Sequence, residues 1–375
     1  MPLDVVVIGL GAMGSATLCE LARRGIPATG IERFTPGHDR GSSHGLTRII
    51  RLGYFEHPSY VPLVRCALAL WRDLESECGE RLLTVTGILE TGRPDGPLVS
   101  GTLASARRHA LDHEVLDANA VARRYPAFRL PPDFVGVVQP DAGFLEPEKA
   151  IAAQLALAAR HGAAVRTGER CLAIEADGRG VRVTTERDTI AAARAIVCAG
   201  PWLGTLMPDL RLPLTVTRQA VLWVAPEEPQ LFERARFPIF LHEGPHGIHY
   251  GFPLHADDGL KMAKHHHAPD PVDPDDHART VSAAEEAAIR RAVAAFLPAT
   301  ADAPLRQART CLYTMTPDGD FLIDRAPGAP QIVIASPCSG HGFKFAPVIG
   351  GALADLALRG ETVHDLSRFR LARLY

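Results

Sequence analysis

Three features that would assign this sequence to other classes of protein are missing from it. Its seven cysteines are widely spaced, odd in number and without a CxxC pair, which favours reduced thiols over a disulfide framework. It has no run near the roughly 18 apolar residues that a membrane span needs. Its 40 basic and 43 acidic residues give a net charge of −3 without a long basic run, which argues against a nucleic-acid partner. We therefore expect a cytoplasmic protein that binds neither membrane nor nucleic acid.

The length and composition indicate a globular protein of two domains. At roughly 150 residues per domain, 375 residues suggest two, and such a chain needs no disulfide or metal for stability. Its 46% apolar and 22% charged residues exclude a disordered chain. The first apolar run follows Asp4 and precedes Arg23 and Arg24, so it lacks the cationic start of a signal peptide.

The N-terminal residues predict a βαβ unit. A β-branched run predicts a strand over 3–9, an apolar face a helix over 13–24, and a second run a strand over 27–33. The order of later elements indicates a nucleotide-binding fold that is interrupted by insertions and completed by the C-terminus. We expect further helices over 59–78, 147–161 and 282–296, then a strand over 331–336, a glycine-rich loop over 339–342 and a helix over 345–359.

The turn inside this βαβ unit carries a dinucleotide fingerprint. Gly9, Gly11 and Gly14 permit a tight turn, the approach of a pyrophosphate and close packing of helix on strand. Glu32 ends the second strand, where an acid accepts hydrogen bonds from a ribose diol. The motif predicts a dinucleotide without separating FAD from NAD, and Arg33 beside the acid leaves NADP open.

Three consecutive histidines, His265, His266 and His267, suggest a metal site at first sight. Adjacent side chains in a strand point to opposite faces, so the three cannot converge on one ion. No cluster of Cys, Asp or Glu accompanies them, and we predict no metal.

A set of ordered motifs extends over nearly the whole chain. With them, the sequence resembles the family of monomeric sarcosine oxidases and N-methyltryptophan oxidases, within the fold group of glycine oxidase and D-amino-acid oxidase. The motifs are GLGAMG (9–14), SSHGLTRIIR (42–51), YVPL (60–63), IVCAGPW (196–202), YGFP (250–253), GLK (259–261), CLYTMTPDGDFLID (311–324), SGHGFKF (339–345) and the tail HDLSRFRLARL (364–374).

The resemblance implies a monomer of the α/β class with two interleaved domains. A Rossmann-like FAD-binding domain is expected from residues 1–81, 147–210 and 311–375. A substrate domain built on an antiparallel sheet is expected from residues 82–146 and 211–310.

The resemblance also implies FAD, attached covalently through Cys311. Attachment needs a thiolate and nearby cations, and His44 and Arg48 match the family positions that promote it. The alternative for Cys311 is an ordinary buried strand cysteine. Backbone N–H groups at Gly340 and Gly342 would stabilise negative charge on the flavin. The other expected cofactor contacts are Ser43, Thr47, Gly200, Trp202, Phe343 and Lys344.

Further matching positions imply roles in binding and catalysis. Arg51 and Lys344 match a pair that binds the substrate carboxylate, for which an arginine fork and a lysine point charge are suited. Lys261 matches a lysine that helps oxygen accept electrons. The expected catalytic residues are Lys261, Arg48, His265, Tyr250 and His341, and Tyr250 also lines the substrate pocket.

Several positions depart from the family pattern and leave the substrate open. They are Leu46, His249, Cys338 and the segment 55–57. They surround the pocket, so they bear on the substrate more than on the chemistry.

The predicted reaction is oxidation of an N-methyl or other secondary amino acid. A hydride equivalent passes to the flavin, oxygen is reduced to hydrogen peroxide, and the imine is hydrolysed to an aldehyde and an amine. One alternative is a flavin dehydrogenase or desaturase of a cyclic amino acid such as pipecolate or proline. A more distant one is a non-catalytic flavin-binding protein, against which the joint presence of Cys311, Lys261, Arg51 and Lys344 argues.

Overall fold

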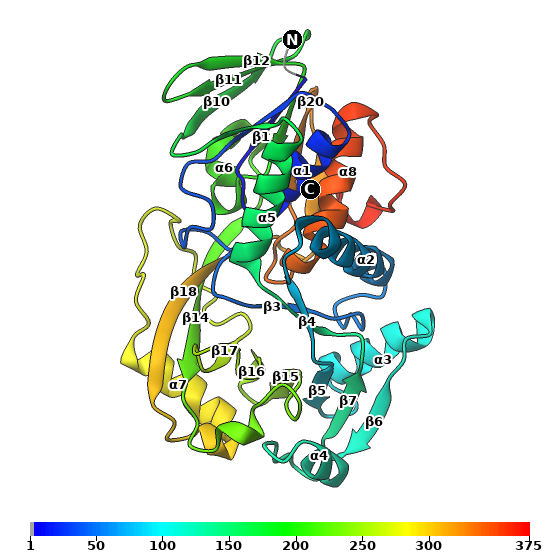
Figure 1. Cartoon of the computed structure of the whole chain (residues 1–375), viewed down its shortest axis with the longest axis vertical. Coiled ribbons are helices and arrows are strands. Elements are labelled where there is room, and N and C mark those ends of the chain that lie inside the picture. Colours follow the sequence, from blue (N-terminus) through cyan, green and yellow to red (C-terminus); the bar gives the residue numbers. More distant parts are fainter. Residues whose placement is uncertain (1–3) are drawn as a thin grey trace.

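A six-stranded, mostly parallel sheet forms the upper half of the molecule in the computed structural model, which describes residues 4–375 (Figure 1). Its order is β19-β20-β13-β1-β2-β9, with only the edge strand β19 antiparallel. The strands are β1 (Val5–Ile8), β2 (Ala28–Ile31), β9 (Ala164–Arg166), β13 (Arg194–Val197), β19 (Leu322–Ala326) and β20 (Ala329–Ser336).

Both faces of this sheet are covered, which explains its apolar sequence. Val5 and Val7 of β1 pack towards the helices, whereas Val6 and Ile8 pack towards a small sheet on the other face. The helices are α1 (Ala12–Arg23), α2 (Tyr60–Cys78), α5 (Pro147–Arg160) and α8 (Ala346–Leu358). The small sheet consists of β10 (Cys171–Ala176), β11 (Val181–Thr185) and β12 (Thr189–Ala192), and α6 (Leu203–Leu206) lies beside it.

An eight-stranded sheet forms the lower half (Figure 1). Its order is β18-β14-β17-β16-β15-β5-β7-β6, antiparallel except for the pair β15–β5. Its strands are β5 (Ile88–Gly92), β6 (Glu114–Asp117), β7 (Val135–Gln139), β14 (Thr215–Val224), β15 (Ile239–Gly244), β16 (Gly247–Gly251), β17 (Leu260–Lys264) and β18 (Leu305–Met315). Its helices are α3 (Pro97–His109), α4 (Ala118–Arg124) and α7 (Ala283–Ala294).

A third, small sheet lies between the two halves (Figure 1). It consists of β3 (Arg48–Ile50), β8 (Gly143–Leu145) and β4 (Leu83–Val85), in the order β3-β8-β4. Short 3-10 helices occupy Gly200–Trp202, Pro208–Leu210, Pro229–Leu231, Pro298–Thr300, Phe343–Phe345, Ser367–Phe369 and Leu371–Leu374.

The α/β class expected from the sequence is confirmed, and each predicted helix lies within two residues of its expected bounds. Residue 3 of the first predicted strand lies outside the described residues. The division into domains stays a proposal: β18 runs across its expected boundary at residue 311, and β3 pairs with β8 from the other expected domain. Within residues 4–375, no helix combines the length and the apolar character that crossing a bilayer requires.

Two glycines fix the turn between β1 and α1. Gly9 has φ +84°, a left-handed conformation in which a side chain is strained. A Cβ at Gly14 would lie 1.7 Å from the Gly9 carbonyl oxygen. The third glycine of the fingerprint therefore lets the first turn of the helix pack directly on the turn that precedes it.

Two neighbouring glycines of α8 provide a test of how α8 packs on α1. A Cβ at Gly350 would lie 2.7 Å from the carbonyl carbon of Ala16, whereas one at Gly351 meets only Arg24 Nη2, at 3.9 Å. We predict that Gly350→Ala lowers the free energy of unfolding by about 1–3 kcal/mol through overpacking. Gly351→Ala, the matched control, should raise it by up to about 1 kcal/mol through helix propensity. Denaturant unfolding measures both, and equal stabilisation by the two would contradict the packing described.

Candidate active site

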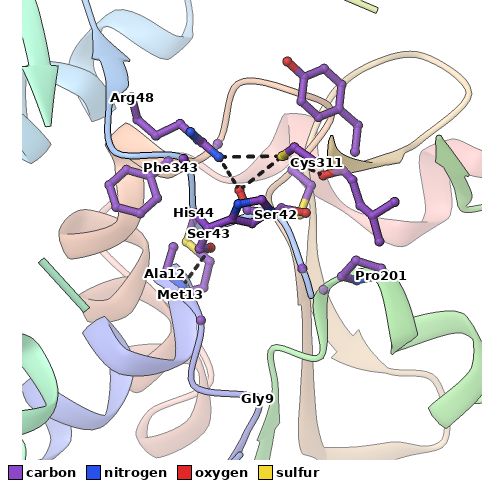
Figure 2. A pocket seen from close by; sticks show the side chains of 18 of the residues that line it. Gly9, Ala12, Met13, Ser42, Ser43, His44, Arg48, Pro201, Cys311 and Phe343 are labelled. Carbon is purple, nitrogen blue, oxygen red and sulfur yellow. Dashed lines mark hydrogen bonds between the residues drawn. The ribbon is translucent and has the colours of Figure 1, made fainter. Parts of the chain in front are cut away.

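A cavity of about 320 Å³ lies between the two large sheets. The glycine turn, the segment 41–51, β18 and the loop 337–344 contribute to its wall. Figure 2 shows one side of it, where Arg48 and Cys311 point towards each other above the turn at Gly9. Every site residue predicted from the sequence lines this cavity except Gly14, which packs against Gly9 instead.

At one end of the cavity, backbone amides hold the Glu32 carboxylate at the end of β2. Its Oε2 accepts from the Leu10 amide at 2.8 Å and its Oε1 from the Phe34 amide at 2.9 Å. Burial alone would raise the pKa of Glu32, but hydrogen bonds from His38 and Phe34 outweigh it, and the pKa lies below its usual value. The carboxylate is thus ionised and fixed beside the glycine turn.

Arg33 and Trp202 close the same end through an aspartate that sequence reasoning missed. Asp275 Oδ1 accepts from Arg33 Nη1 at 2.7 Å and from Trp202 Nε1 at 3.0 Å. Asp275 belongs to the proline-rich loop between β17 and α7, and only the folded chain brings it to Arg33. The Arg33 guanidinium is therefore already paired, which disfavours a second role on a ribose phosphate.

Near the middle of the cavity, the Cys311 thiol lies against a fixed guanidinium. Arg48 Nη2 is 3.6 Å from Cys311 Sγ and donates to the Ser42 carbonyl at 2.9 Å, and Arg48 Nη1 donates to the Thr47 carbonyl at 2.9 Å (Figure 2). Cys311 is buried in β18, in register with Gln219 of β14. The arrangement places a positive charge where it stabilises a thiolate.

His44 is buried in the cavity wall with both ring nitrogens lacking a hydrogen-bond partner among the described residues. Burial, and then the charge of Arg48, lower its pKa to about 3, so the imidazole is neutral. An unpartnered buried polar group is costly. His44 is therefore a group that a ligand in the cavity could satisfy.

Lys261 reaches the cavity from β17 and holds the loop that carries His44. Its Nζ donates to the carbonyls of Gly45 at 2.6 Å and Thr47 at 2.7 Å, and to Thr47 Oγ1 at 3.2 Å. Burial, followed by the charge of Arg48, holds the pKa of Lys261 well below its usual value. All three donors of the ammonium group are used, so its position is fixed.

The same loop is held from behind by Glu148, near the start of α5. Glu148 Oε1 accepts from the amides of Gly45 at 2.7 Å and Leu46 at 3.1 Å. Leu46 has φ +70°, a strained conformation for a leucine, and these bonds together with Lys261 hold it. Glu148 was missed by the sequence analysis because no motif connects it to the loop.

At the other end of the cavity, Arg51 is buried between two carboxylates. Its Nη2 donates to Glu56 Oε1 at 2.8 Å and Oε2 at 2.7 Å, and its Nη1 to the Gly53 carbonyl. Its Nε lies 3.8 Å from Glu90 Oε1. Burial would raise the pKa of Glu56, yet Arg51 lowers it to about 2. Glu56 also lines the cavity, so a protein carboxylate already sits on the predicted carboxylate-binding fork.

Lys344 completes this end of the cavity. Its Nζ donates to the His341 carbonyl at 2.6 Å and lies 3.4 Å from Tyr54 Oη. His341 Nε2 is 3.1 Å from the Gly319 carbonyl, which only accepts, so Nε2 carries the proton and Nδ1 accepts from Tyr54 Oη at 2.6 Å. Burial, then Arg51, lower the pKa of Lys344 to about 7, and burial lowers that of His341 to about 4.

Tyr250 and His265 form the aromatic side of the cavity. His265 Nδ1 is 3.4 Å from Tyr313 Oη, and burial holds the pKa of His265 well below its usual value. The expectation that the three histidines lie in a strand is wrong: β17 ends at Lys264, His265 and His266 form the turn that follows, and His267 comes after that turn. His267 Nε2 lies 3.2 Å from Glu285 Oε1. Among residues 4–375, no three His, Cys, Asp or Glu side chains are grouped as metal ligands.

Comparison with known proteins identifies the family. The family model described as FAD dependent oxidoreductase (DAO) matches residues 4–356. The chain belongs to this family. It is 40% identical to a monomeric sarcosine oxidase of Streptomyces avermitilis, over 99% of this chain and 97% of that protein. It is 34% identical to an N-methyl-L-tryptophan oxidase of Salmonella typhi, over 100% and 99%.

A solved structure shows the same fold over almost the whole chain. NikD, described as an unusual amino acid oxidase essential for nikkomycin biosynthesis, superposes with a TM-score of 0.86 at 29% identity, covering 98% of this chain and 96% of that one. The resemblance stated from the sequence motifs is confirmed, and the protein is an FAD-dependent oxidoreductase.

The residues present in the cavity fit FAD. The glycine turn packs tightly on the chain after β13, because a Cβ at Gly9 would lie 2.5 Å from the Cys198 carbonyl oxygen, and it brings the N-terminus of α1 to the cavity wall, where a helix N-terminus suits a pyrophosphate. The Glu32 carboxylate suits a ribose diol, and the unpartnered nitrogens of His44 face the same cavity. One continuous wall connects Glu32 to Cys311, as an elongated dinucleotide requires.

We predict that Glu32→Ala lowers the flavin content of the purified protein severalfold. The change removes the ribose acceptor and leaves the Leu10 and Phe34 amides unpaired, at a cost of about 1–3 kcal/mol. The measurement is the ratio of flavin to protein absorbance. Glu286→Ala is the matched control, since that carboxylate pairs with Arg290 on α7, away from the cavity. Equal flavin content in the two variants would show that Glu32 does not bind the cofactor.

Proposed function

We propose that this enzyme oxidises N-methyl or other secondary amino acids and passes the electrons to oxygen. The observation that carries the proposal is that two buried cations, Arg51 and Lys344, line the same cavity as Lys261 and Cys311. Relatives named sarcosine oxidase and N-methyl-L-tryptophan oxidase support this substrate class. Because the sarcosine oxidase relative is named monomeric, we also propose that this enzyme is a monomer.

The substrate carboxylate would bind where Glu56 now lies. Arg51 directs its Nη2 to the cavity side, and both carboxylate oxygens of Glu56 accept from this nitrogen in this structure. A substrate carboxylate makes the same paired contact and adds the Lys344 ammonium. Binding is therefore an exchange of one carboxylate for another on the same guanidinium.

The histidines around the substrate amine would not return a proton to it at neutral pH. His265 and His341 both have lowered pKa values because they are buried, so neither supplies a proton at neutral pH. Tyr250 and Phe252 add apolar surface to the wall and exclude water. Oxidation of the neighbouring C–H bond requires the lone pair of the neutral amine, so the ammonium group of the amino acid would release its proton to solvent as it binds.

FAD, when bound, supplies the acceptor for two electrons. The chain holds it through Glu32 and the glycine turn, and we propose a thioether link at Cys311, whose thiolate Arg48 stabilises. Lys261 places a positive charge at the cavity wall, where it stabilises the negative charge that oxygen acquires on reduction.

Acid precipitation tests the covalent link. The wild-type pellet should keep its flavin absorbance, whereas Cys311→Ser should release flavin into the supernatant. Cys338→Ser, a second cysteine of the cavity wall, is the matched control and should keep flavin in the pellet. Free flavin from the wild-type protein would refute attachment at Cys311.

A substrate panel with two variants tests the reaction. Sarcosine, N-methyl-L-tryptophan, proline and pipecolate are compared by release of peroxide and aldehyde. Arg51→Met should lower kcat/KM at least about thirtyfold, because loss of a charge-assisted pair costs about 2–5 kcal/mol. Arg290→Met, on the surface of α7, should leave it unchanged.

Each outcome of the panel separates one function from the others. Peroxide with released aldehyde supports oxidation of N-methyl substrates. Peroxide without aldehyde from a ring substrate indicates a cyclic amino acid, and turnover only with an artificial acceptor indicates a dehydrogenase. A protein inert towards the whole panel would contradict the proposed substrate class.

A further inference from the structure

One buried acid beside the cavity has no role in the reaction described above. Glu90 lies in β5, is 0% exposed, and has no hydrogen-bond partner for either carboxylate oxygen among the described residues. It does not line the cavity. Among residues 4–375, the one ion-pair contact of Glu90 joins its Oε1 to Arg51 Nε at 3.8 Å, which is too long for a hydrogen bond. A buried carboxylate without hydrogen bonds is costly, and such groups tend to mark a function.

The surroundings of Glu90 contain few other charges. Its neighbours on the adjacent strands are Leu241 of β15 and Val137 of β7, both apolar. From α3 comes the buried hydroxyl of Thr102, which makes no hydrogen bond in this structure but lies beside the carboxyl group and favours its ionised form, lowering the pKa of Glu90. The charged groups that act on it are Arg51, which attracts its ionised form, and Glu56, which repels it. The protonation of Glu90 is therefore coupled to Arg51 more than to any other group.

We propose that Glu90 is a positioning residue that sets, from behind the cavity wall, how strongly Arg51 binds the substrate carboxylate. This inference rests on the proposed function, in which Arg51 binds that carboxylate. When Glu90 is protonated, it has no charge that offsets the positive charge of Arg51, and the substrate carboxylate binds tightly. When Glu90 is ionised, its negative charge partly offsets that of Arg51 and weakens the binding of an anion on the other side of the guanidinium.

The direction of the pH dependence follows from two buried groups. Burial raises the pKa of Glu90 to about 7, so the carboxyl group becomes ionised as the pH rises through neutrality. Lys344, with a pKa lowered to about 7, loses its charge over the same interval. Both changes weaken the binding of an anion at higher pH. Glu56 and His341, with pKa values of about 2 and 4, do not titrate there.

Binding of methoxyacetate to the holoenzyme tests the proposal. This ether analogue of an N-methyl amino acid has one charge throughout, so any pH dependence belongs to the protein. The dissociation constant is measured by calorimetry from about pH 6 to about pH 8.5. As the pH rises, the affinity of the wild type for methoxyacetate should fall because both Glu90 and Lys344 change their charge. The affinity of Glu90→Gln should fall less, because only Lys344 then changes its charge.

The variants differ most at high pH. At the upper end Glu90→Gln should bind methoxyacetate about tenfold more tightly than wild type, since removal of one charge near Arg51 has an effect of this order. At the lower end the two should agree within about twofold, because Glu90 is then largely protonated in the wild type. kcat at saturating substrate should stay unchanged, and Glu90→Asp should restore the second titration.

Two further variants keep the outcome decisive. Thr102→Val removes a hydroxyl that lowers the pKa of Glu90, so the fall in affinity should move to higher pH. Glu243→Gln, on the neighbouring strand β15, changes a carboxylate that caps Leu98 and should behave as wild type. Should Glu90→Gln fail to fold, the shift in Thr102→Val decides the question.

Failure of this inference is distinct from failure of the proposed function. A wild-type pH profile in both Glu90→Gln and Thr102→Val, or equal weakening at every pH, would overturn the role of Glu90. Arg51→Met should lose methoxyacetate binding at every pH. Unchanged binding in Arg51→Met would refute the carboxylate site itself.

Discussion

The central constraint on this structure is the burial of positive charge around one cavity. Arg51, Lys261 and Lys344 are nearly inaccessible to water, and Arg48 is only half-buried. Desolvating a cation is expensive unless each donor finds an acceptor. Backbone carbonyls satisfy Lys261 and most of Arg48, whereas the Glu56 carboxylate and the Gly53 carbonyl accept from Arg51. The loops that deliver these oxygens are therefore fixed by the charges that they surround.

This constraint also connects the two halves of the molecule. The loop 42–47 leaves the dinucleotide sheet, yet its carbonyls accept from Lys261 of the eight-stranded sheet. Glu148 of α5 holds the same loop from the opposite side. The strained backbone of Leu46 lies between these attachments. The cavity is thus held together by hydrogen bonds across the sheets, in addition to the apolar cores within each half.

The sequence allowed the fold and a set of residues along the cavity wall to be predicted, because both depend on local patterns. The turn at Gly9 follows from glycine spacing, and Cys311 and Lys344 follow from short motifs that match a family. The partners of these residues were not predictable in the same way. Glu90 is one acid in a short apolar strand, and Asp275 lies more than 200 residues from Arg33. Their roles arise from register and packing, which no spacing along the chain encodes.

Arg51 shows why such partners matter for recognition of an anion. A buried guanidinium without a counter-charge would destabilise the enzyme that has no substrate bound. A guanidinium whose donors were all bonded to a fixed carboxylate of the protein would not exchange that carboxylate for one of a substrate. In this structure, Arg51 lies between two acids that contact it differently. Glu56 makes strong bonds from the cavity side, where a ligand can replace it, and Glu90 makes none while staying close. In the role proposed for it, Glu90 stays beside Arg51 whichever carboxylate lies on the cavity side, so its protonation state changes how strongly the guanidinium attracts that carboxylate.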